Sequence, residues 1–526
     1  MSVNTAGDSQ KEIAAGAGGV ALATLASRIL GLVRDTAIAG IFTAFQTDCF
    51  FMALTIPNVL RRLLGEGSLN AAVVPVYAEL RERGSPRDVR AYLGALWGMA
   101  LVVLLAISAA GVLFSPAIVK LYAWGFAAIP DKFRLTDNLN RIMFPYIFFT
   151  GLAAISAGIL NVHRKFFTPA LSPAIWNVAV IVCILVIPSS LAARGINTAY
   201  ALAVGVMAGG ALQLGYQAFL QRRTATLPRP TLEARNEGLR KTLALLLPLL
   251  AGFGIYQVDI LLSRLFASFL PQGSVSYLYY AMRLIEVPQG VVFLAIGTAS
   301  LPMMSRLIAR GETDALKQAY LSTLQLTFFV SIPATAGLVA MAEPVVCCIF
   351  FRGAFTADMF RPTWTALVLM SLGILGTAVV RVTTPVYYAY KDTRTPVAIA
   401  GANLLIYVGF CLALMGPWKH LGLAVALSIA PVTQALMLMI YLRRKTGRIG
   451  MRRLLVRVAA FCLASLGMVL VMLAVCSFGR WERGGNDARN ILVMLAGGAA
   501  GVAVYLLLAR LLGAEELRLL RWRRRS

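Results

Sequence analysis

Long apolar runs alternate with short polar connections along the whole chain. Each run has about 20 residues, enough to cross ~30 Å of hydrocarbon as an α-helix. The polar connections are too short to form a separate folded domain. The pattern predicts an all-α polytopic membrane protein with about fourteen spans, at residues 17–40, 46–80, 92–116, 138–161, 169–190, 197–220, 242–267, 273–309, 318–341, 363–388, 396–415, 421–442, 453–477 and 489–511.

Two of these runs are too long for simple spans and contain residues that interrupt helices. The run 46–80 holds Pro57, Gly65 and Gly67, and the run 273–309 holds Pro288 and Gly290. Because proline and glycine break or bend helices, we expect these five residues to act as hinges. Interrupted helices at corresponding places in two halves of a transporter point to its substrate site.

The second half of the chain repeats the first at an offset of 227 to 228 residues. The matching pairs are Pro75 with Pro302, Pro116 with Pro344, Gly125 with Gly353, and Thr168-Pro169 with Thr395-Pro396. Each copy holds six spans, so the copies are expected to form two parallel lobes around a central cleft, as in transporters that alternate access. The two C-terminal spans lie outside the repeat, and serve either as structural support or as a surface that handles lipid.

These boundaries divide the chain into six parts. We expect a cytoplasmic N-terminal segment (1–16), an N-lobe of six helices (17–220), a basic cytoplasmic linker (221–241), a C-lobe of six helices (242–442), the two extra helices (443–511) and a basic cytoplasmic tail (512–526).

The composition agrees with a membrane protein, and the charge gives its orientation. Hydrophobic residues make up 59% of the chain and charged residues 14%, while the formal net charge is +26. Lysine and arginine gather in alternate loops and in the tail "RWRRRS", which predicts that those loops and both termini are cytoplasmic. We therefore interpret the basic charge as a topology signal. The next interpretation is that it binds anionic lipid headgroups, and we expect no nucleic-acid partner.

The first span carries charges near its middle, in "LASRILGLVRDTA". On insertion scales Arg28, Arg34 and Asp35 together cost about 8 to 10 kcal/mol, so they are expected to face an aqueous cavity. Helical geometry places Arg28 within about 20° of Asp35 and about 120° from Arg34. The alternative is that one arginine reaches the membrane interface or pairs permanently with Asp35.

Arginine predominates among the other charges inside the predicted spans. Guanidinium groups suit phosphate oxygens, so a cleft dominated by arginine is expected to bind an anion such as a diphosphate. The other charges are Arg61, Arg62, Glu66, Asp259, Arg264, Arg283, Glu286 and Arg381.

Catalytic and metal sites find little support in the chain. It has two histidines and seven cysteines without metal-ligand spacing, and it lacks a Walker-type Gly-Lys-Ser loop. We therefore expect neither an enzyme nor a metal site.

Four motifs together resemble the MurJ/MviN family of lipid II flippases, within the multidrug/oligosaccharidyl-lipid/polysaccharide exporter superfamily. They are "SRILGLVRD" (27–35), "TDCFFMALTIPNVLRRLLGEGSLNAAVVPV" (47–76), "GSVSYLYYAMRLIEVPQG" (273–290) and "FRGAFT" (351–356). The resemblance covers nearly the whole chain. It implies two lobes around a cationic cavity, with the last two helices forming a groove for the undecaprenyl tail.

The resemblance also implies roles for individual residues. By motif, the family's essential cavity arginines fall on Arg28, Arg34, Arg61 and Arg283. The supporting residues are then Asp35, Asp48, Glu66, Ser276 and Glu286. The chain departs from the motifs at Thr55 and Met282, where relatives often carry a basic and an acidic residue.

Some relatives bind sodium in the second lobe through acidic and amide side chains. Asp259 and Asn403 match that chemistry, but Tyr407 stands where a carboxylate is expected. We therefore predict no cofactor, leave sodium open, and expect the membrane potential to contribute to transport.

The sequence thus predicts a flippase that moves undecaprenyl-diphosphate-linked disaccharide-pentapeptide from the inner to the outer leaflet of the bacterial cytoplasmic membrane. We expect a monomer whose partners are this lipid, the surrounding membrane lipids and proteins of cell-wall synthesis and division. The alternatives are a flippase for another polyprenyl-linked glycan, a transporter of soluble solutes with the same two lobes, and a scaffold that binds the precursor without moving it.

Overall fold

The computed structural model describes residues 5–64, 68–224, 226–255, 257–447, 450–485 and 487–517. These residues form helices and connecting turns, with no β-strand among them. The chain separates into two compact units, Met1–Phe269 and Leu270–Ser526. The all-α fold class predicted from the apolar pattern is confirmed.

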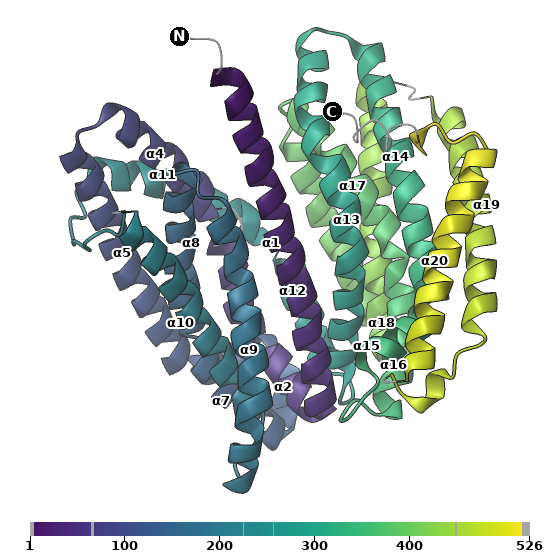
Figure 1. The fold of residues 1–526 in the computed structure, drawn as a ribbon, viewed down its shortest axis with the longest axis horizontal. Coiled ribbons are helices and arrows are strands. Elements are labelled where there is room, and N and C mark those ends of the chain that lie inside the picture. Colours follow the sequence, from purple (N-terminus) through teal and green to yellow (C-terminus); the bar gives the residue numbers. More distant parts are fainter. Residues whose placement is uncertain are drawn as a thin grey trace. The chain divides into compact units, whose positions relative to one another are not determined.

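The first unit contains helices α1 to α12, shown from purple to teal in Figure 1. Their bounds are α1 (Thr5–Ile41), α2 (Ala44–Ala53), α3 (Thr55–Leu63), α4 (Leu69–Arg83), α5 (Pro86–Leu113), α6 (Ser115–Tyr122), η2 (Trp124–Ala128), α7 (Pro130–Met143), α8 (Tyr146–Val162), α9 (Phe167–Ala193), α10 (Tyr200–Arg223), α11 (Glu237–Ile255) and α12 (Val258–Ser268). Tyr92, Leu96, Ile147 and Ile155 belong to its buried core, to which α4, α5 and α8 contribute. Helix α1 packs along α9.

The second unit contains α13 to α20, from teal to yellow in Figure 1. Their bounds are α13 (Ser274–Ala309), α14 (Thr313–Ala340), α15 (Ala342–Phe350), α16 (Ala357–Ser371), α17 (Gly373–Ala389), α18 (Arg394–Thr446), α19 (Met451–Cys476), η3 (Trp481–Arg483) and α20 (Ala488–Leu511). Tyr320, Leu324, Val382 and Leu438 form part of a core between α14, α17 and α18. Backbone angles outside the helical region at Lys419 (φ 51°, ψ −129°) divide α18 into two helical halves.

Local sequence explains where several helices begin. Ser85 caps α5, where its hydroxyl accepts from the Asp88 amide and the Asp88 carboxylate accepts from the Ser85 amide. Thr43 and Gln46 make the same reciprocal pair at α2. Such capping boxes satisfy amides that the first helical turn leaves without partners.

Nine of the described helical stretches are long and apolar enough to cross a membrane by length and composition. They cover ten of the fourteen predicted spans, because α18 contains two of them. The other four predicted spans correspond to α1, to α2 through α4, to α11 and α12, and to α13. These four include the charged and interrupted segments on which the functional hypothesis rests.

Helix boundaries repeat at the offset found in the sequence. Helices α5 and α14 both have 28 residues, α8 and α17 both have 17, and each pair begins 227 positions apart. The turn residues Arg164 and Lys391, also 227 apart, both have φ 58°. The repeat is therefore a repeat of backbone conformation as well as of motifs.

The linker between the two sequence repeats is held on the first unit. The Thr231 amide donates to the Gly94 carbonyl at 2.9 Å. A Cβ atom at Gly98 would lie 2.0 Å from the Thr231 carbonyl oxygen, so the linker passes where α5 has no side chain. After the linker, α11 packs on α3, α4 and α5, and Tyr92 is hydrogen-bonded to Thr242 at 2.8 Å.

The boundary between the two sequence repeats differs from the boundary between the two compact units. Residues 242–269 begin the second repeat, and the repeat predicts that they belong to the C-lobe. In the structure α11 and α12 belong to the first compact unit, whose boundary falls at Phe269. A helix can belong to one repeat by sequence and pack against helices of the other. The repeat sets the order of the helices, whereas their contacts depend on the side chains.

Candidate functional site

Arg34 on α1 is held by three side chains of the first unit. Its Nε and Nη2 donate to Asp35 Oδ1 at 2.9 and 2.6 Å, and its Nη1 donates to Asn177 Oδ1 at 3.0 Å. The guanidinium carbon lies 4.9 Å from the centroid of the Trp176 ring. Arg34 is 7% exposed and Asp35 fully buried. Arg34 is therefore an ion-pair partner of Asp35, which answers a question that helical geometry left open.

Arg28 lies on a different face of the same helix. It is exposed, and it makes no hydrogen bond or ion pair with any residue that the structure describes. Its neighbours Leu25, Ile29 and Val33 are exposed as well. The two arginines of α1 thus differ: Arg34 is enclosed against α9, whereas Arg28 is presented at the surface of the first unit.

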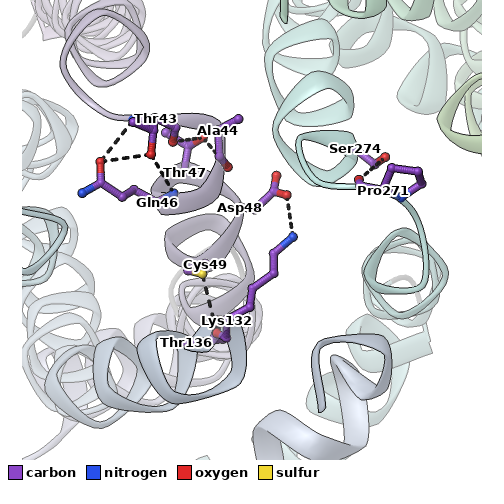
Figure 2. A network of polar contacts seen from close by, with 10 residues as sticks. All are labelled: Thr43, Ala44, Gln46, Thr47, Asp48, Cys49, Lys132, Thr136, Pro271 and Ser274. Atoms are coloured by element: carbon purple, nitrogen blue, oxygen red, sulfur yellow. Dashed lines mark hydrogen bonds and ion pairs between the residues drawn. The ribbon is translucent and has the colours of Figure 1, made fainter. Parts of the chain in front are cut away.

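Asp48 on α2 forms a second buried ion pair, which sequence analysis missed. Lys132 Nζ, from α7, lies 2.9 Å from Asp48 Oδ2, and both side chains are almost completely buried. Figure 2 shows the two side chains pointing toward each other from their helices. The ammonium also lies 4.1 Å from the centroid of the Phe126 ring. Lys132 falls between the predicted spans 92–116 and 138–161, but Pro130 begins α7 eight residues before the second of these spans, and this helix brings the lysine inward.

The interrupted second span contains the next candidate residues. Helix α2 ends at Ala53 and α3 begins at Thr55. Pro57 therefore lies in the first turn of α3, where proline is tolerated. Arg61 Nε donates to the side-chain oxygen of Asn58 at 3.0 Å. Three predicted residues of this segment, Gly65, Glu66 and Gly67, lie outside the described residues.

The second unit supplies Arg283 and its predicted partner. Arg283 Nη1 lies 2.6 Å from Glu286 Oε2, three residues along α13, and both side chains are partly exposed. Ser276, two turns earlier on α13, is fully buried. Helix α13 runs without interruption through Pro288 and Gly290, so their role as hinges stays a prediction.

The structure brings some of the predicted residues together within each unit. Arg34 joins Asp35, and Arg283 joins Glu286. Arg28 and Arg61 lie in the first unit with Arg34, but on other faces or elements. Sequence reasoning missed Lys132, Trp176 and Asn177. The only available signal was their polar or aromatic character inside or beside apolar runs, because nothing in the spacing links α2 to α7 or α1 to α9.

The residues considered for sodium lie in different units. Asp259 belongs to α12 of the first unit, and Asn403 to α18 of the second. The Asn403 side-chain oxygen accepts a hydrogen bond from the Thr433 hydroxyl at 2.8 Å. Within the described residues, no group of three or more histidine, cysteine, aspartate or glutamate side chains is arranged to hold a metal ion.

The two C-terminal helices pack on α14 and leave apolar faces exposed. Phe461, Met468 and Met472 of α19 join a buried cluster with Phe329 of α14, and the Tyr505 hydroxyl of α20 donates to the Phe329 carbonyl at 2.6 Å. Large side chains on the outer faces are more than half exposed, namely Leu455, Val456, Leu463, Leu466, Leu470, Leu492, Leu495, Val502 and Leu507. These faces are apolar, as required of a surface in contact with lipid chains.

Comparisons with known proteins agree on one family. The family model described as lipid II flippase MurJ matches residues 38–484. A probable lipid II flippase MurJ of Bdellovibrio bacteriovorus is 33% identical over 511 residues, covering 95% of this chain and 94% of the relative. The lipid II flippase MurJ of Burkholderia cenocepacia is 31% identical over 429 residues, with 80% and 82% covered.

Solved structures give the same result for the fold. A lipid II flippase MurJ in an inward closed conformation has a TM-score of 0.74 and 25% identity, with 94% of this chain and 98% of that chain covered. An inward-facing multidrug resistance transporter of the MATE family and MOP superfamily has a TM-score of 0.62 and 14% identity, with 80% and 94% covered, which is a likeness of fold. The chain therefore belongs to the lipid II flippase MurJ family, a family of membrane transporters and not of enzymes, as its motifs predicted.

Proposed function

We propose that this protein is a lipid II flippase of the bacterial cytoplasmic membrane. The observation that carries the proposal is the match of residues 38–484 to the MurJ family. The substrate is then the undecaprenyl-diphosphate-linked precursor of peptidoglycan. Both termini and the basic loops lie in the cytoplasm in this proposal, in line with the distribution of lysine and arginine.

In this proposal the diphosphate is bound by arginines while the two units alternate access to it. Arg28 supports such a role because it is exposed and has no partner among the described residues. Arg283 supports it because its guanidinium is partly exposed beside Glu286. Arg61 belongs to the same set by motif. Guanidinium groups form charge-assisted, bidentate hydrogen bonds with phosphate oxygens.

Arg34 belongs to the proposed set of diphosphate-binding arginines on the condition that its present contacts break. Its guanidinium already contacts Asp35, Asn177 and Trp176. A direct contact with substrate would first require some of these contacts to break, and hydrogen bonds to charged groups contribute about 1.5–3 kcal/mol each. In the described conformation Arg34 therefore supports the proposal by fixing helix α1.

The membrane potential is the proposed contribution to directionality. With the inside negative, outward movement of one negative charge through the full field is favoured by about 2.3 kcal/mol per 100 mV. The apolar outer faces of α19 and α20 are the proposed contact for the undecaprenyl chain. No cofactor enters the proposal.

A leaflet-specific assay tests the proposal directly. Cells depleted of the protein should lose lipid-linked precursor from the outer leaflet, and the wild-type chain should restore it. Arg28→Ala and Arg283→Ala should fail to restore it at equal expression. Arg194→Ala is the matched control, because Arg194 is an exposed residue at the C-terminal end of α9.

Two results would contradict the proposal. Outer-leaflet precursor that is unchanged after depletion, in cells without a second flippase, would exclude transport and favour a scaffold that binds the precursor. Full restoration by a variant that combines Arg28→Ala, Arg34→Ala and Arg283→Ala would exclude the arginine mechanism while leaving the flippase function intact.

A further inference from the structure

Asn177 contacts helix α1 at two points through the two ends of its amide. Its Oδ1 accepts from Arg34 Nη1 at 3.0 Å, and its Nδ2 donates to the Ser27 carbonyl at 3.0 Å. Asn177 is 5% exposed. A single buried side chain of α9 therefore holds both the backbone and a charged side chain of α1.

Helical geometry explains how one amide reaches both points. Ser27 and Arg34 are seven residues apart, so they lie on nearly the same face of α1, two turns from each other. Helical carbonyls point toward the C-terminus and side chains lean toward the N-terminus. The Ser27 carbonyl and the Arg34 side chain thus approach each other between those turns, where Asn177 meets them.

Trp176, the neighbour of Asn177 on α9, also contacts the guanidinium. Its ring faces Arg34 at 4.9 Å and lies 5.9 Å from the Tyr146 ring of α8. A Cβ atom at Gly209 of α10 would lie 2.6 Å from the Trp176 ring, so the indole fills the space that this glycine leaves. The half-buried indole thus packs against α8 and α10 while it contacts the guanidinium.

These contacts set the rotation of α1 about its axis. Arg28 is about 100° from Ser27 and about 120° from Arg34 around the helix. When Ser27 and Arg34 face α9, Arg28 therefore lies to the side of that face and does not point at α9, and it is exposed. Asp35 lies within about 20° of Arg28 around the helix, two turns further along, yet it is fully buried, so the exposure of Arg28 depends on its position along α1 as well as on this rotation.

We infer that Asn177 is a positioning residue for transport, which holds α1 against α9 so that Arg34 is enclosed and Arg28 is presented. The inference rests on the proposed function, because presentation of Arg28 matters only if Arg28 binds the diphosphate. It assigns to α9 a part in substrate recognition that acts entirely through α1.

Transport in the full chain is the first test. Asn177→Leu preserves the approximate size and removes both hydrogen bonds, and should lower outer-leaflet precursor in depleted cells about tenfold at equal expression. Asn177→Gln retains an amide and should restore transport to within about threefold of the wild type. Asn138→Leu is the control, because it removes one hydrogen bond of the same unit, to the Tyr200 hydroxyl at 3.0 Å, without touching α1.

A double-mutant cycle tests the contact itself in purified protein. Asn177→Leu and Arg34→Met should each lower the midpoint of thermal unfolding, and the double variant should lose no more than the larger single loss. The losses of Asn138→Leu and Arg34→Met should instead add. This measurement does not depend on the substrate, so it still decides the contact if the flippase function proves wrong.

The inference is overturned by either of two outcomes. Wild-type transport in Asn177→Leu would show that the contact does not position Arg28. Additive unfolding losses for Asn177→Leu and Arg34→Met would show that the two side chains do not act together.

Discussion

The two sequence repeats have nearly the same scaffold, but their first two segments differ in opposite ways. In the first repeat α1 is continuous, and the following segment is divided into α2, α3 and α4. In the second repeat the equivalent of α1 is divided into α11 and α12, and the following helix, α13, is continuous. Three of these four segments carry the charges assigned to transport, and the fourth, α11 with α12, carries Asp259 and Arg264. The comparison shows that helices of the packed scaffold, such as α5 with α14 and α8 with α17, have the same lengths in both repeats, whereas the charged segments differ.

The ion pairs differ between the repeats as well. Arg34–Asp35 and Lys132–Asp48 in the first repeat are nearly inaccessible, whereas Arg283–Glu286 in the second is partly exposed. At the offset of 227, the position equivalent to Pro57 is Leu284 and the position equivalent to Arg61 is Pro288. Neither the hinges nor the charges therefore follow the repeat. The first repeat uses charge to hold helices together, and the second keeps its pair accessible.

The largest effect is expected from Lys132→Met. Removing one partner of a buried ion pair costs about 3–5 kcal/mol of stability, because the other charge stays in a low-dielectric site. Arg283→Met in the second repeat should cost about 1 kcal/mol or less, since a partly exposed pair contributes little. Thermal or denaturant unfolding of the two purified variants measures both. Equal losses of stability in the two variants would show that the ion pairs of the two repeats do not differ in their contribution to folding.

A second, smaller effect is expected where the linker crosses α5. The side chain in Gly98→Leu would meet the Thr231 carbonyl and displace the linker. Overpacking of this kind costs about 1–3 kcal/mol. Amide hydrogen exchange across residues 226–236 should become faster, since Thr231 would lose its bond to Gly94. Gly215→Leu on α10 is the control, because a Cβ atom there meets nothing within 4 Å. Unchanged exchange in Gly98→Leu would show that the linker is not held by α5.

The smallest effect concerns a pair found only in the second repeat. Asp392 lies 2.8 Å from Lys445, and hydrogen bonds from Lys445 and the Thr395 amide lower the pKa of its carboxyl to about 2. The equivalent position in the first repeat is Lys165. Because the folded pKa lies below the ordinary value of 3.8, folding favours the ionised form. The stabilisation is present above pH 3.8 and is lost as the pH falls toward 2.

Unfolding of the wild type and of Asp392→Asn across that range checks this expectation. The wild type should be more stable by about 0.5 kcal/mol near pH 6, a small amount because the pair is partly exposed to solvent. The difference should shrink as the solution is acidified below pH 4. A difference that grows on acidification would have the wrong sign for a carboxyl with a lowered pKa.

The sequence predicted more of the helical scaffold than of the candidate site. The apolar run 169–190 predicts a helix, and the repeat of Pro116 at Pro344 marks equivalent positions in the two halves, because both signals can be read from the sequence alone. Asp35 was recognised as a partner for an arginine, but the choice between Arg28 and Arg34 depended on a third side chain. Asn177 lies 143 residues from Arg34, and no local pattern records such a contact.

The sequence by itself determined the membrane class, the helical scaffold, the internal repeat and the family, because hydrophobic periodicity, turn residues and motifs are properties of neighbouring residues. Only the tertiary structure decided that Arg34 is enclosed while Arg28 is exposed, that Lys132 faces Asp48, and that α11 packs with the first unit. These outcomes depend on which helix face meets which neighbour. A rotation of α1 by a third of a turn would point Arg28 toward α9 and Arg34 away from it without changing a residue of the sequence.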